Sequence, residues 1–317
     1  MCDQYIESDL PLPELGSGVL HGSTEGVDPL RIRAVHRRHF PPPFEIDGVA
    51  FFRRRHDRSN GAEFIAEDVA RITTDGSGSE ILVEHDPSAN PVTLAHLVVD
   101  QAVPRALSER GLMVLHATGV VVDGLGLGFL GATGTGKSTL AMSFVVDGAE
   151  LVADDCLAMR QADNRIDALP SYGSGRLRPD SLEALRLTEQ SLPGSPGKRR
   201  IVTRGESSPR SMTALFVLRR DPAAQGPVVV RLSETQALWS VTQHSFASQG
   251  LRSETALAAM ALLTPLVRRL AVYDLSYGSG FDALASVRGE VLRVVQRDCR
   301  AAPSPPLPTN IASGSPK

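Results

Sequence analysis

One segment constrains the fold of this chain more than any other. Residues 131–138 (GATGTGKS) fit the pattern G-x-x-x-x-G-K-[ST] at every defined position. The apolar residues 127–130 before it predict a strand, and residues 138–146 after it predict an amphipathic helix. A strand, a glycine turn and a helix in this order form the context that the pattern requires. The chain is therefore predicted to have an α/β fold.

A glycine turn of this kind binds phosphate. Successive backbone N–H groups point into one small volume, and the positive end of the following helix adds to the attraction for phosphate oxygens. Lys137 is expected to reach the β- and γ-phosphates and Ser138 to bind Mg²⁺, so ATP and Mg²⁺ are the predicted cofactors. The alternative is a turn that only joins a strand to a helix. The predicted nucleotide-binding residues are Gly131, Thr133, Gly134, Thr135, Gly136, Lys137, Ser138 and Thr139.

Two adjacent acids follow a second predicted strand. Residues 149–153 (AELVA) predict that strand, which ends at Asp154 and Asp155. Ligands of open α/β sheets lie at the carboxyl ends of strands. There, one carboxylate can orient Mg²⁺ and the other can accept a proton from an attacking hydroxyl. The pair is predicted to be catalytic, and a helix cap or a solvated turn is the alternative.

A long apolar run precedes the glycine turn. Residues 112–122 (LMVLHATGVVV) predict a strand, and the hairpin signal Asp123-Gly124 predicts that it folds back beside the strand entering the turn. His116 is the only titratable side chain of the run, and this register places it near the phosphate end of the sheet. A histidine in the site and a histidine satisfied within the core remain alternatives.

The order and spacing of three segments resemble a known family. Residues 115–120 (LHATGV), 131–139 and 151–155 (LVADD) together resemble the catalytic domain of the HPr kinase/phosphorylase family. The resemblance implies a P-loop carboxykinase-like core and ATP-dependent phosphorylation of a seryl hydroxyl. The roles it implies are phosphate binding for Lys137, Mg²⁺ binding for Ser138, general base for Asp155 and a place in the catalytic pocket for His116.

The sequence departs from that family downstream. Residues 172–182 (YGSGRLRPDSL) stand in place of the family's signature of the Glu-Ile-Arg-Gly type. Asp180 falls about where the metal-binding glutamate would lie, and Arg176 or Arg178 can neutralise charge on a transferring phosphoryl group. The alternative is that Asp180 belongs to the start of a helix over residues 181–187 and the arginines lie on a solvated edge. This departure counts against a reverse, phosphorylase activity.

A looser group fits the sequence better. The chain resembles HPr-kinase-like proteins, including kinases of lasso-peptide precursors, in joining an unrelated N-terminal half to a Leu-His-Ala segment. We predict a Mg²⁺- and ATP-dependent kinase of a serine in a peptide or small protein. The alternatives are a kinase of a free small molecule, such as an amino acid, and a non-catalytic module that responds to ATP. The predicted catalytic residues are His116, Lys137, Asp155, Arg176 and Arg178, and the predicted metal ligands are Ser138, Asp154 and Asp180.

Composition agrees with a cytoplasmic enzyme. The chain has 317 residues, 42% of them hydrophobic, so it can bury a full α/β core. Its net charge of −3 implies no strong electrostatic attraction to nucleic acid or to membranes. Residues 1–7 lack the basic and apolar regions of a signal peptide. Cys2, Cys156 and Cys299 show no paired or metal-binding spacing, which is typical of a reducing compartment. The family resemblance adds a homo-oligomer to the expected partners.

Four regions are expected along the chain. Residues 1–43 predict a loose arm, and residues 44–110 predict a small α+β region with short strands and a helix over 93–110. Residues 111–300 form the predicted catalytic domain, and the Pro- and Ser-rich residues 301–317 predict a disordered tail. The N-terminal region is expected either to recognise substrate or to cover the sheet.

A polar loop is predicted over residues 191–209, with Lys198-Arg199-Arg200 at its centre. The loop either closes over the site and offers charge to phosphate, or it faces water as an ordinary surface loop. After it, strands are predicted over 212–219, 228–232 and 272–277, and helices over 255–269 and 282–295.

Overall fold

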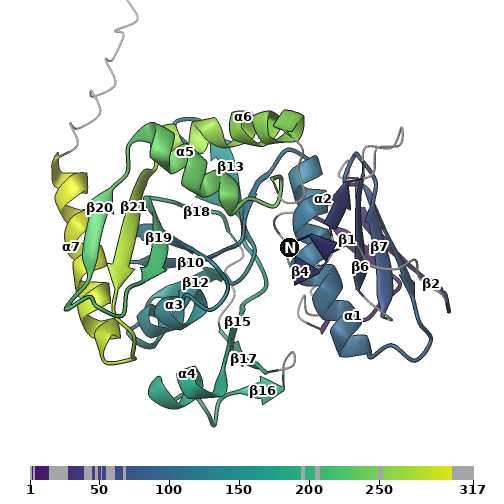
Figure 1. Cartoon of the computed structure of the whole chain (residues 1–317), viewed down its shortest axis with the longest axis horizontal. Helices are drawn as coiled ribbons and strands as arrows, with labels where there is room; N and C mark the ends of the chain where they lie inside the picture. The colour runs from purple at the N-terminus through teal and green to yellow at the C-terminus, as the bar shows by residue number, and fades with distance from the viewer. Residues whose placement is uncertain are drawn as a thin grey trace, which may run out of the picture.

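The computed structural model describes residues 2, 4–13, 28–38, 45–46, 49–50, 52–54, 61–66, 69–193, 197–203, 208–248 and 253–301. The chain is a mixed α/β protein with several β-sheets (Figure 1). The prediction for the tail lies outside the described residues from residue 302 onward. Within the described ranges, no helix has both the length and the apolar character needed to cross a membrane.

The central sheet has six strands and carries the glycine turn. In the order β12-β10-β11-β19-β21-β20, its strands are Glu150–Ala153, Ala117–Val122, Leu125–Leu130, Ala214–Arg220, Ala271–Tyr277 and Val228–Arg231. Strands β11, β19 and β21 are parallel neighbours, and β10 lies antiparallel between β11 and β12. Strands β11 and β12 therefore run in the same direction and end at the same edge of the sheet, as expected for the glycine turn and the acid pair.

The predicted hairpin is confirmed, but the apolar run before it is not one strand. Asp123 and Gly124 have φ of 49° and 77°, the left-handed pair that a two-residue hairpin turn favours. The run over residues 112–122 breaks at His116 into β9 (Met113–Leu115) and β10, which belong to different sheets. At the break, the N–H of His116 donates to the carbonyl of His244, so the chain leaves one sheet and enters the other at this residue.

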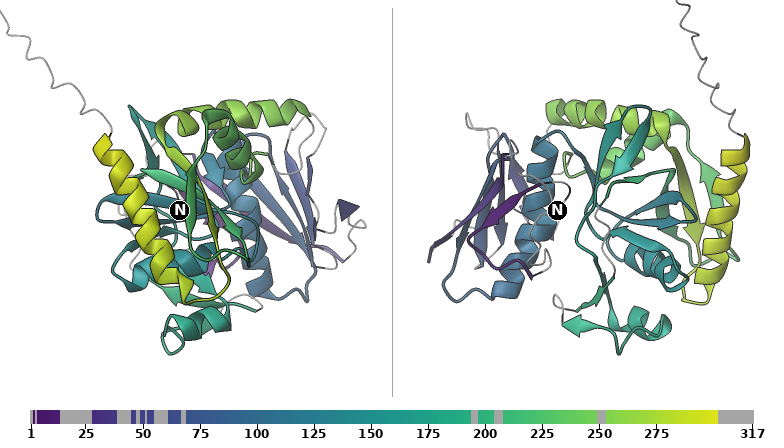
Figure 2. Two further views of the ribbon diagram at one scale, coloured as in Figure 1. Left: turned by 60° about the vertical axis from the view of Figure 1, so that its left-hand side comes forward. Right: turned by 180° about the vertical axis from the view of Figure 1, so that it is seen from behind.

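Helices cover both faces of the central sheet (Figures 1 and 2). Helices α3 (Lys137–Val146) and α7 (Ala283–Ala301) pack on the face where the ring of Phe216 lies 5.9 Å from Phe129 and 5.0 Å from Tyr273. Helices α5 (Glu234–Gln243) and α6 (Ser253–Arg269) pack on the other face. The elements predicted after residue 210 are confirmed, and α5, which begins at a capping box, is an addition to them.

Two smaller sheets flank the central one. One has the order β18-β14-β13-β9, with β18 (Arg210–Ser211), β14 (Arg165–Ala168) and β13 (Leu157–Ala162) beside β9. The other has the order β15-β17-β16, with strands Ser174–Leu177, Arg199–Val202 and Leu192–Pro193, and helix α4 (Pro179–Ala184) follows β15. The predicted polar loop therefore contains two short strands. In Figure 1 these strands and α4 lie below α3.

The N-terminal region is a sheet covered by a helical segment. The sheet has the order β1-β2-β8-β7-β6-β5, with strands Ile6–Ser8, Leu30–His36, Glu80–His85, Ala70–Thr74, Ala62–Ala66 and Phe52–Arg54, and a separate hairpin joins β3 (Glu45–Ile46) to β4 (Val49–Ala50). The helical segment consists of α1 (Pro91–Leu97), the π-helical turn η2 (Val98–Ala102) and α2 (Val103–Glu109). Residues 30–36 thus do not belong to a loose arm. Their alternation of apolar residues and arginines is the pattern of a half-buried strand, and Leu30 and Ile32 are buried.

One hydrophobic core joins the N-terminal region to the rest of the chain. The helical segment lies between the N-terminal sheet and the remaining elements in Figure 1 and in the right view of Figure 2. The core contains Val98 and Val103 of this segment, Ile72 of the sheet, and Val114 and Leu169 from beyond residue 110. The two regions are therefore packed together through shared apolar contacts.

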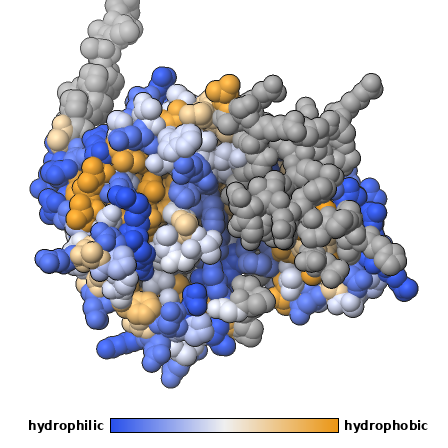
Figure 3. Space-filling view, in the orientation of Figure 1, coloured by the Kyte–Doolittle hydropathy of each residue, from blue (hydrophilic) through white to orange (hydrophobic). Residues whose placement is uncertain are grey.

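Four strongly exposed apolar side chains lie away from the glycine turn. Strand β20 ends the central sheet, and Val228 and Val230 on it are 55% and 54% exposed. The space-filling view shows hydrophobic residues gathered over this strand (Figure 3). Trp239 of α5 and Leu257 of α6 are exposed as well. None of these four side chains lines the cavity at the end of β11.

Candidate active site

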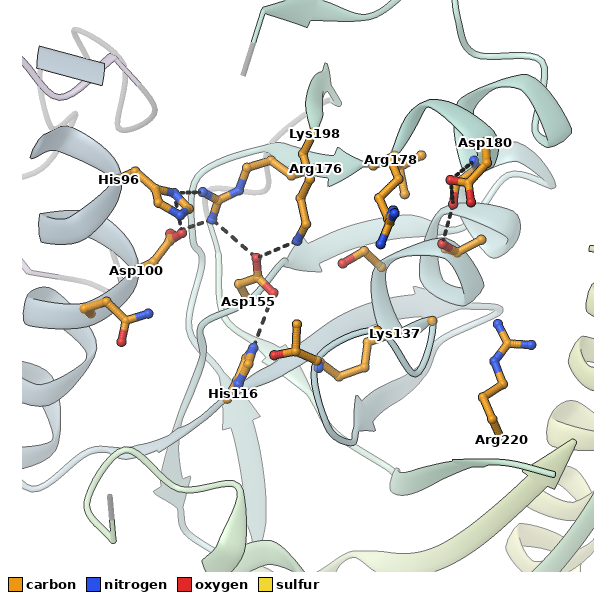
Figure 4. Close-up of a pocket in the computed structure, with 18 of the residues that line it drawn as sticks. His96, Asp100, His116, Lys137, Asp155, Arg176, Arg178, Asp180, Lys198 and Arg220 are labelled. Atoms are coloured by element: carbon orange, nitrogen blue, oxygen red, sulfur yellow. Dashed lines mark hydrogen bonds and ion pairs between the residues drawn. The ribbon is translucent and has the colours of Figure 1, made fainter. Parts of the chain in front are cut away.

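A cavity of about 660 Å³ opens at the edge where β11 and β12 end. Most of its lining comes from three parts of the chain: the glycine turn, the segment from the acid pair to the sheet β15-β17-β16, and the N-terminal segment α1–η2 (Figure 4). The remaining lining residues are His116, Arg220, Phe246 and Phe281. The predicted site residues that line it are His116, Thr133, Gly134, Gly136, Lys137, Ser138, Thr139, Asp155, Arg176, Arg178 and Asp180. Gly131, Thr135 and Asp154 are not among the lining residues. Most of the predicted residues therefore meet in one cavity.

Three residues of the glycine turn have backbone conformations that disfavour any residue with a Cβ atom. Gly131, Gly134 and Gly136 have φ of 150°, 86° and 98°, values that favour glycine. A Cβ atom on Gly136 would also lie 2.6 Å from Nη2 of Arg220. Gly136 caps the start of α3, so the free N–H groups of that helix lie at the cavity. The turn is thus a cradle of backbone donors.

Lys137 is buried at the base of this cradle. Its Nζ donates to the carbonyl oxygens of Gly131 at 2.7 Å and Ala132 at 3.2 Å. Burial lowers the pKa of Lys137, although the nearby charges of Asp155 and Asp154 act to raise it. A cation at the start of a helix can exchange carbonyl partners for phosphate oxygens with a gain in charge complementarity.

Asp154 holds Ser138 from beneath the cavity. Its Oδ1 accepts hydrogen bonds from Thr118 and Ser138, both at 2.8 Å, and its Oδ2 accepts one from the backbone N–H of Arg176 at 2.8 Å. Burial and the charge of Asp155 raise the pKa of Asp154. Because the Ser138 hydroxyl donates its proton to Asp154, the lone pairs of Oγ are left for a cation. Asp154 therefore orients Ser138, and its role as a metal ligand stays a prediction.

Asp155 lies at the centre of the site (Figure 4). Its Oδ1 is 3.5 Å from Nε2 of His116, and its Oδ2 is 3.4 Å from Nη2 of Arg176 and 3.8 Å from Nζ of Lys198. Burial acts to raise the pKa of Asp155, but the contact with His116 and the charges of Lys198 and Arg176 hold it well below its usual range. Of the two alternatives for His116, the geometry favours a place in the site.

Arg176 links the acid pair to the N-terminal region. It is 3% exposed, and its Nη2 donates to the Asp100 carboxylate and, at 3.1 Å, to the hydroxyl of Tyr172. The Asp100 carboxylate also lies 2.7 Å from Nδ1 of His96. Burial acts to lower the pKa of Arg176, and the neighbouring Tyr172 and Asp100 raise it overall. His96 and Asp100 were not predicted to belong to the site, although their spacing of four residues places them on one face of the predicted helix.

The start of α4 is tied to the glycine turn. Pro179 is at the first position of the helix and Asp180 lies in its first turn, so the alternative prediction of a helix start is confirmed. Asp180 accepts from the N–H of Ser181 at 2.8 Å, and the hydroxyl of Ser181 lies 2.9 Å from that of Thr139 in α3. Because Asp180 and Arg178 also line the cavity, a helix start and a place in the site are compatible.

Two further cations line the cavity without having been assigned to it from the sequence. Lys198 belongs to the predicted polar loop over residues 191–209, and its ammonium group lies beside Asp155. At the end of β19, Arg220 donates from Nε to the carbonyl of Thr135 at 3.0 Å, and its guanidinium lies 4.4 Å from the ring centroid of Tyr277. Only the parallel pairing of β19 with β11 brings Arg220 to the glycine turn, so no local motif indicated it.

The residues present fit a triphosphate and Mg²⁺. The cradle offers backbone donors and Lys137, while Ser138 and Asp180 offer the oxygen ligands that Mg²⁺ prefers. Across the described parts of the chain, no cluster of three or more His, Cys, Asp or Glu side chains is arranged to hold a metal. A Mg²⁺ ion here would take its other ligands from phosphate and water, as is usual for this ion.

Comparison with known proteins gives one sequence relative. No protein-family model matches the chain. The HPr kinase/phosphorylase of Geobacter sulfurreducens is 43% identical over 61 residues, which are 19% of this chain and 19% of that protein, so the match spans only about a fifth of the curated relative. Among solved structures, the HPr(Ser) kinase/phosphatase from Coxiella burnetii has a TM-score of 0.31 at 15% identity, over 59% of this chain and 96% of that one. The sequence match confirms what the motifs indicated: this chain is HPr kinase/phosphorylase-like in the segment that is shared.

Proposed function

We propose that this chain is a Mg²⁺- and ATP-dependent kinase that transfers the γ-phosphoryl group to a serine hydroxyl of a peptide or small protein. One observation carries the proposal. An ionised carboxylate, Asp155, lies in the same cavity as the phosphate-binding Lys137, with Arg176 and Lys198 beside it. The sequence similarity to HPr kinase/phosphorylase supports the kinase type. A P-loop carboxykinase-like core for residues 111–300 is part of the same proposal.

The triphosphate would bind along the glycine turn. Backbone N–H groups from Gly134 to Thr139 would donate to phosphate oxygens, and Lys137 would exchange the carbonyls of Gly131 and Ala132 for the β- and γ-phosphates. Ser138, oriented by Asp154, and Asp180 would hold Mg²⁺, which when bound neutralises charge on the β- and γ-phosphates.

Asp155 would act as the general base. In the transfer step, the serine oxygen forms a bond to the γ-phosphorus, the bond from that phosphorus to the bridging oxygen breaks, and ADP leaves. The proton of the serine hydroxyl passes to Asp155, while His116 keeps the carboxylate in place. Positioning and charge neutralisation supply most of the rate in such a reaction.

The cations around Asp155 would serve the transferring group as well. Arg176 and Lys198 contact the Asp155 carboxylate, and Arg178 lines the same cavity. Because the contacts to Arg176 and Lys198 hold the pKa of Asp155 low, Asp155 becomes a better proton acceptor when phosphoryl oxygens compete for these two cations. Proton transfer and neutralisation of the phosphoryl charge are therefore coupled in this proposal.

The test follows label from γ-labelled ATP and Mg²⁺ into peptide, protein and metabolite fractions of an extract of the source cells. The Asp155→Asn variant should lose transfer by about 100-fold or more, the usual contribution of a general base, and keep ATP binding. Asp163→Asn is the matched control, because Asp163 (φ 50°) and Asp155 (φ 62°) share a left-handed backbone while Asp163 is exposed in the β13–β14 turn.

The fraction in which the label is found decides between the proposed function and its alternatives. Asp155-dependent label in a peptide or protein is the expected result and would identify the acceptor. Label confined to metabolites would replace the proposal by a small-molecule kinase. Tight ATP binding without transfer would replace it by a non-catalytic module, and full activity of Asp155→Asn would remove the assigned base.

A further inference from the structure

A carboxylate from the N-terminal region reaches into the site. Asp100 lies on the π-helical turn η2, and its side chain is 7% exposed. In sequence it is far from both the glycine turn and the acid pair. One of its oxygens accepts from Nη2 of Arg176, and the other lies 2.7 Å from Nδ1 of His96 (Figure 4). Both oxygens of this buried acid are therefore committed to partners at the cavity wall.

The unusual helix turn that carries Asp100 has a cause in the sequence. Pro104 has no N–H to donate to the carbonyl of Asp100, four residues earlier, and its ring crowds that carbonyl. The helix widens here, and the N–H of Val103 donates to the carbonyl of Val98, five residues earlier. A wide turn of this kind changes the direction of the side chains on it, and here the side chain of Asp100 meets Arg176.

Arg176 joins the two carboxylates. Its Nη2 contacts Asp100 on one side and lies 3.4 Å from Oδ2 of Asp155 on the other. Its backbone N–H is anchored separately, on Asp154 at 2.8 Å. The peptide group is thus fixed by Asp154, whereas the position of the long side chain depends on what holds its guanidinium. Asp100 is the carboxylate that contacts it most closely.

We propose that Asp100, assisted by His96, is a positioning residue that fixes the Arg176 guanidinium against Asp155, so that the N-terminal region completes the catalytic machinery. The inference rests on the proposed function and assigns a role to a region with no predicted part in the chemistry. Removing Asp100 would leave Arg176 buried with one carboxylate fewer, and a buried charge that loses a partner moves or becomes costly.

The charge state of Asp100 agrees with this role. Burial acts to raise the pKa of Asp100, but the contacts with His96 and Arg176 lower it below its usual range. Asp100 is therefore ionised at neutral pH and is a charged acceptor for Arg176. The Nδ1 atom of His96 lies near both Asp100 and Arg176. When Nδ1 carries a proton, it donates to Asp100, and when Nδ1 carries none, it accepts from Arg176.

The test compares kcat and the KM for MgATP in Asp100→Asn and wild type, with the acceptor fraction found by the labelling experiment. We expect kcat to fall by about 10- to 100-fold, the usual effect of losing a supporting partner, and the KM for MgATP to stay within about twofold. In the Arg176→Ala background, Asp100→Asn should cause no further loss, because a residue that acts through Arg176 has nothing left to position.

Glu63→Gln is the matched control. Glu63 is a buried carboxylate of the same N-terminal region, 1% exposed, and its Oε1 accepts from Nε of Arg71 at 2.6 Å, but neither residue lines the cavity. It should lose stability without a change in kcat. His96→Gln provides a second variant at an accessible position, since His96 is 33% exposed, and it should lower kcat by about 3- to 10-fold even if Asp100→Asn fails to fold.

Four results would overturn the inference alone. Three of them are an unchanged kcat in Asp100→Asn or, where that variant does not fold, in His96→Gln; equal losses in Asp100→Asn and Glu63→Gln; and a full additional loss in the double variant. A change confined to the KM for MgATP would also overturn it, because the glycine turn does not contact Asp100. Absence of transfer by the wild-type protein would instead overturn the proposed function, and this inference with it.

Discussion

Two adjacent aspartates lie in different environments, which shift their pKa values in opposite directions. Asp154 is fully buried and accepts three hydrogen bonds, and its pKa is raised, whereas Asp155 meets His116, Arg176 and Lys198 and its pKa is lowered. The sequence predicted one carboxylate for the metal side and one for the proton. The contacts place Asp154 one step further from the cavity than Asp155, behind Ser138, and the two roles stay predictions.

His244 should make the stability of this protein sensitive to acid. Burial, then the charges of Lys137 and His116, lower the pKa of His244 from its ordinary 6.5 to about 4. Since the unfolded chain binds the proton more readily, the stabilising contribution is fully present above pH 6.5 and is lost as pH falls toward 4. After allowance for partial exposure, we expect a loss of about 2 kcal/mol from this residue.

Urea unfolding of wild type and His244→Gln between pH 7 and 4.5 measures this effect. The free energy of unfolding of His244→Gln should vary less with pH than that of wild type over this interval. Changing the exposed His36 to Gln should leave the wild-type pH dependence intact. Equal pH dependence in His244→Gln and wild type would show that His244 is not held in its neutral form.

At the scale of elements, local sequence patterns predicted the type and position of single elements well. They predicted contacts between elements that are distant in sequence poorly. The strand β11, the glycine turn, α3 and β12 follow from an apolar run, a motif and a second apolar run. The break at His116 could not be predicted, because it depends on the carbonyl of His244, more than a hundred residues away in the chain. Arg220 and Lys198 reach the cavity through strand pairing, which leaves no trace in local spacing.

Gly136→Ala tests whether the glycine turn is shaped by close packing as well as by backbone conformation. Its Cβ would meet Arg220 Nη2 at 2.6 Å and the Tyr277 hydroxyl at 3.1 Å. We expect a loss of more than about 2 kcal/mol in the free energy of unfolding, from strain and displaced neighbours together, and weaker MgATP binding. Chemical denaturation and nucleotide titration measure the two effects.

Gly148→Ala separates these causes. Gly148 has φ of 99°, against 98° for Gly136, but a Cβ on it would meet nothing within 4 Å. It should therefore show backbone strain alone, about 1 kcal/mol, and unchanged MgATP binding. Equal losses of stability in the two variants, with equal binding, would mean that Arg220 and Tyr277 do not confine the turn.

At the scale of the whole molecule, the boundary predicted near residue 110 divides the sequence more sharply than the structure. Val98, Val103 and Leu107 of the helical segment share one core with Val114 and Leu169 from beyond that boundary. The short strands and the helix predicted over residues 44–110 indicated a separate small region, because such local patterns are visible in sequence. The shared core is not visible in sequence, because it depends on which face of the helical segment packs against which sheet.

The shared core predicts that the described parts of the chain unfold in one cooperative transition. Calorimetry should give a single transition whose calorimetric and van't Hoff enthalpies agree, because the N-terminal region shares its core with residues beyond residue 110. Leu169→Ala should shift that transition as a whole. Leu169 is 1% exposed and packs with the N-terminal helices, and such a truncation costs roughly 2 to 5 kcal/mol.

Leu284→Ala on α7 is the comparison that decides between one unit and two. Leu284 is 5% exposed and packs in the core between α3, α7 and the central sheet, which contains no residue of the N-terminal region. In one cooperative unit, both variants lower the same transition. If the N-terminal region were independent, Leu284→Ala would shift one of two transitions and leave the other in place. The Asp100–Arg176 contact would then join bodies that move separately, which would argue against a fixed position for Arg176.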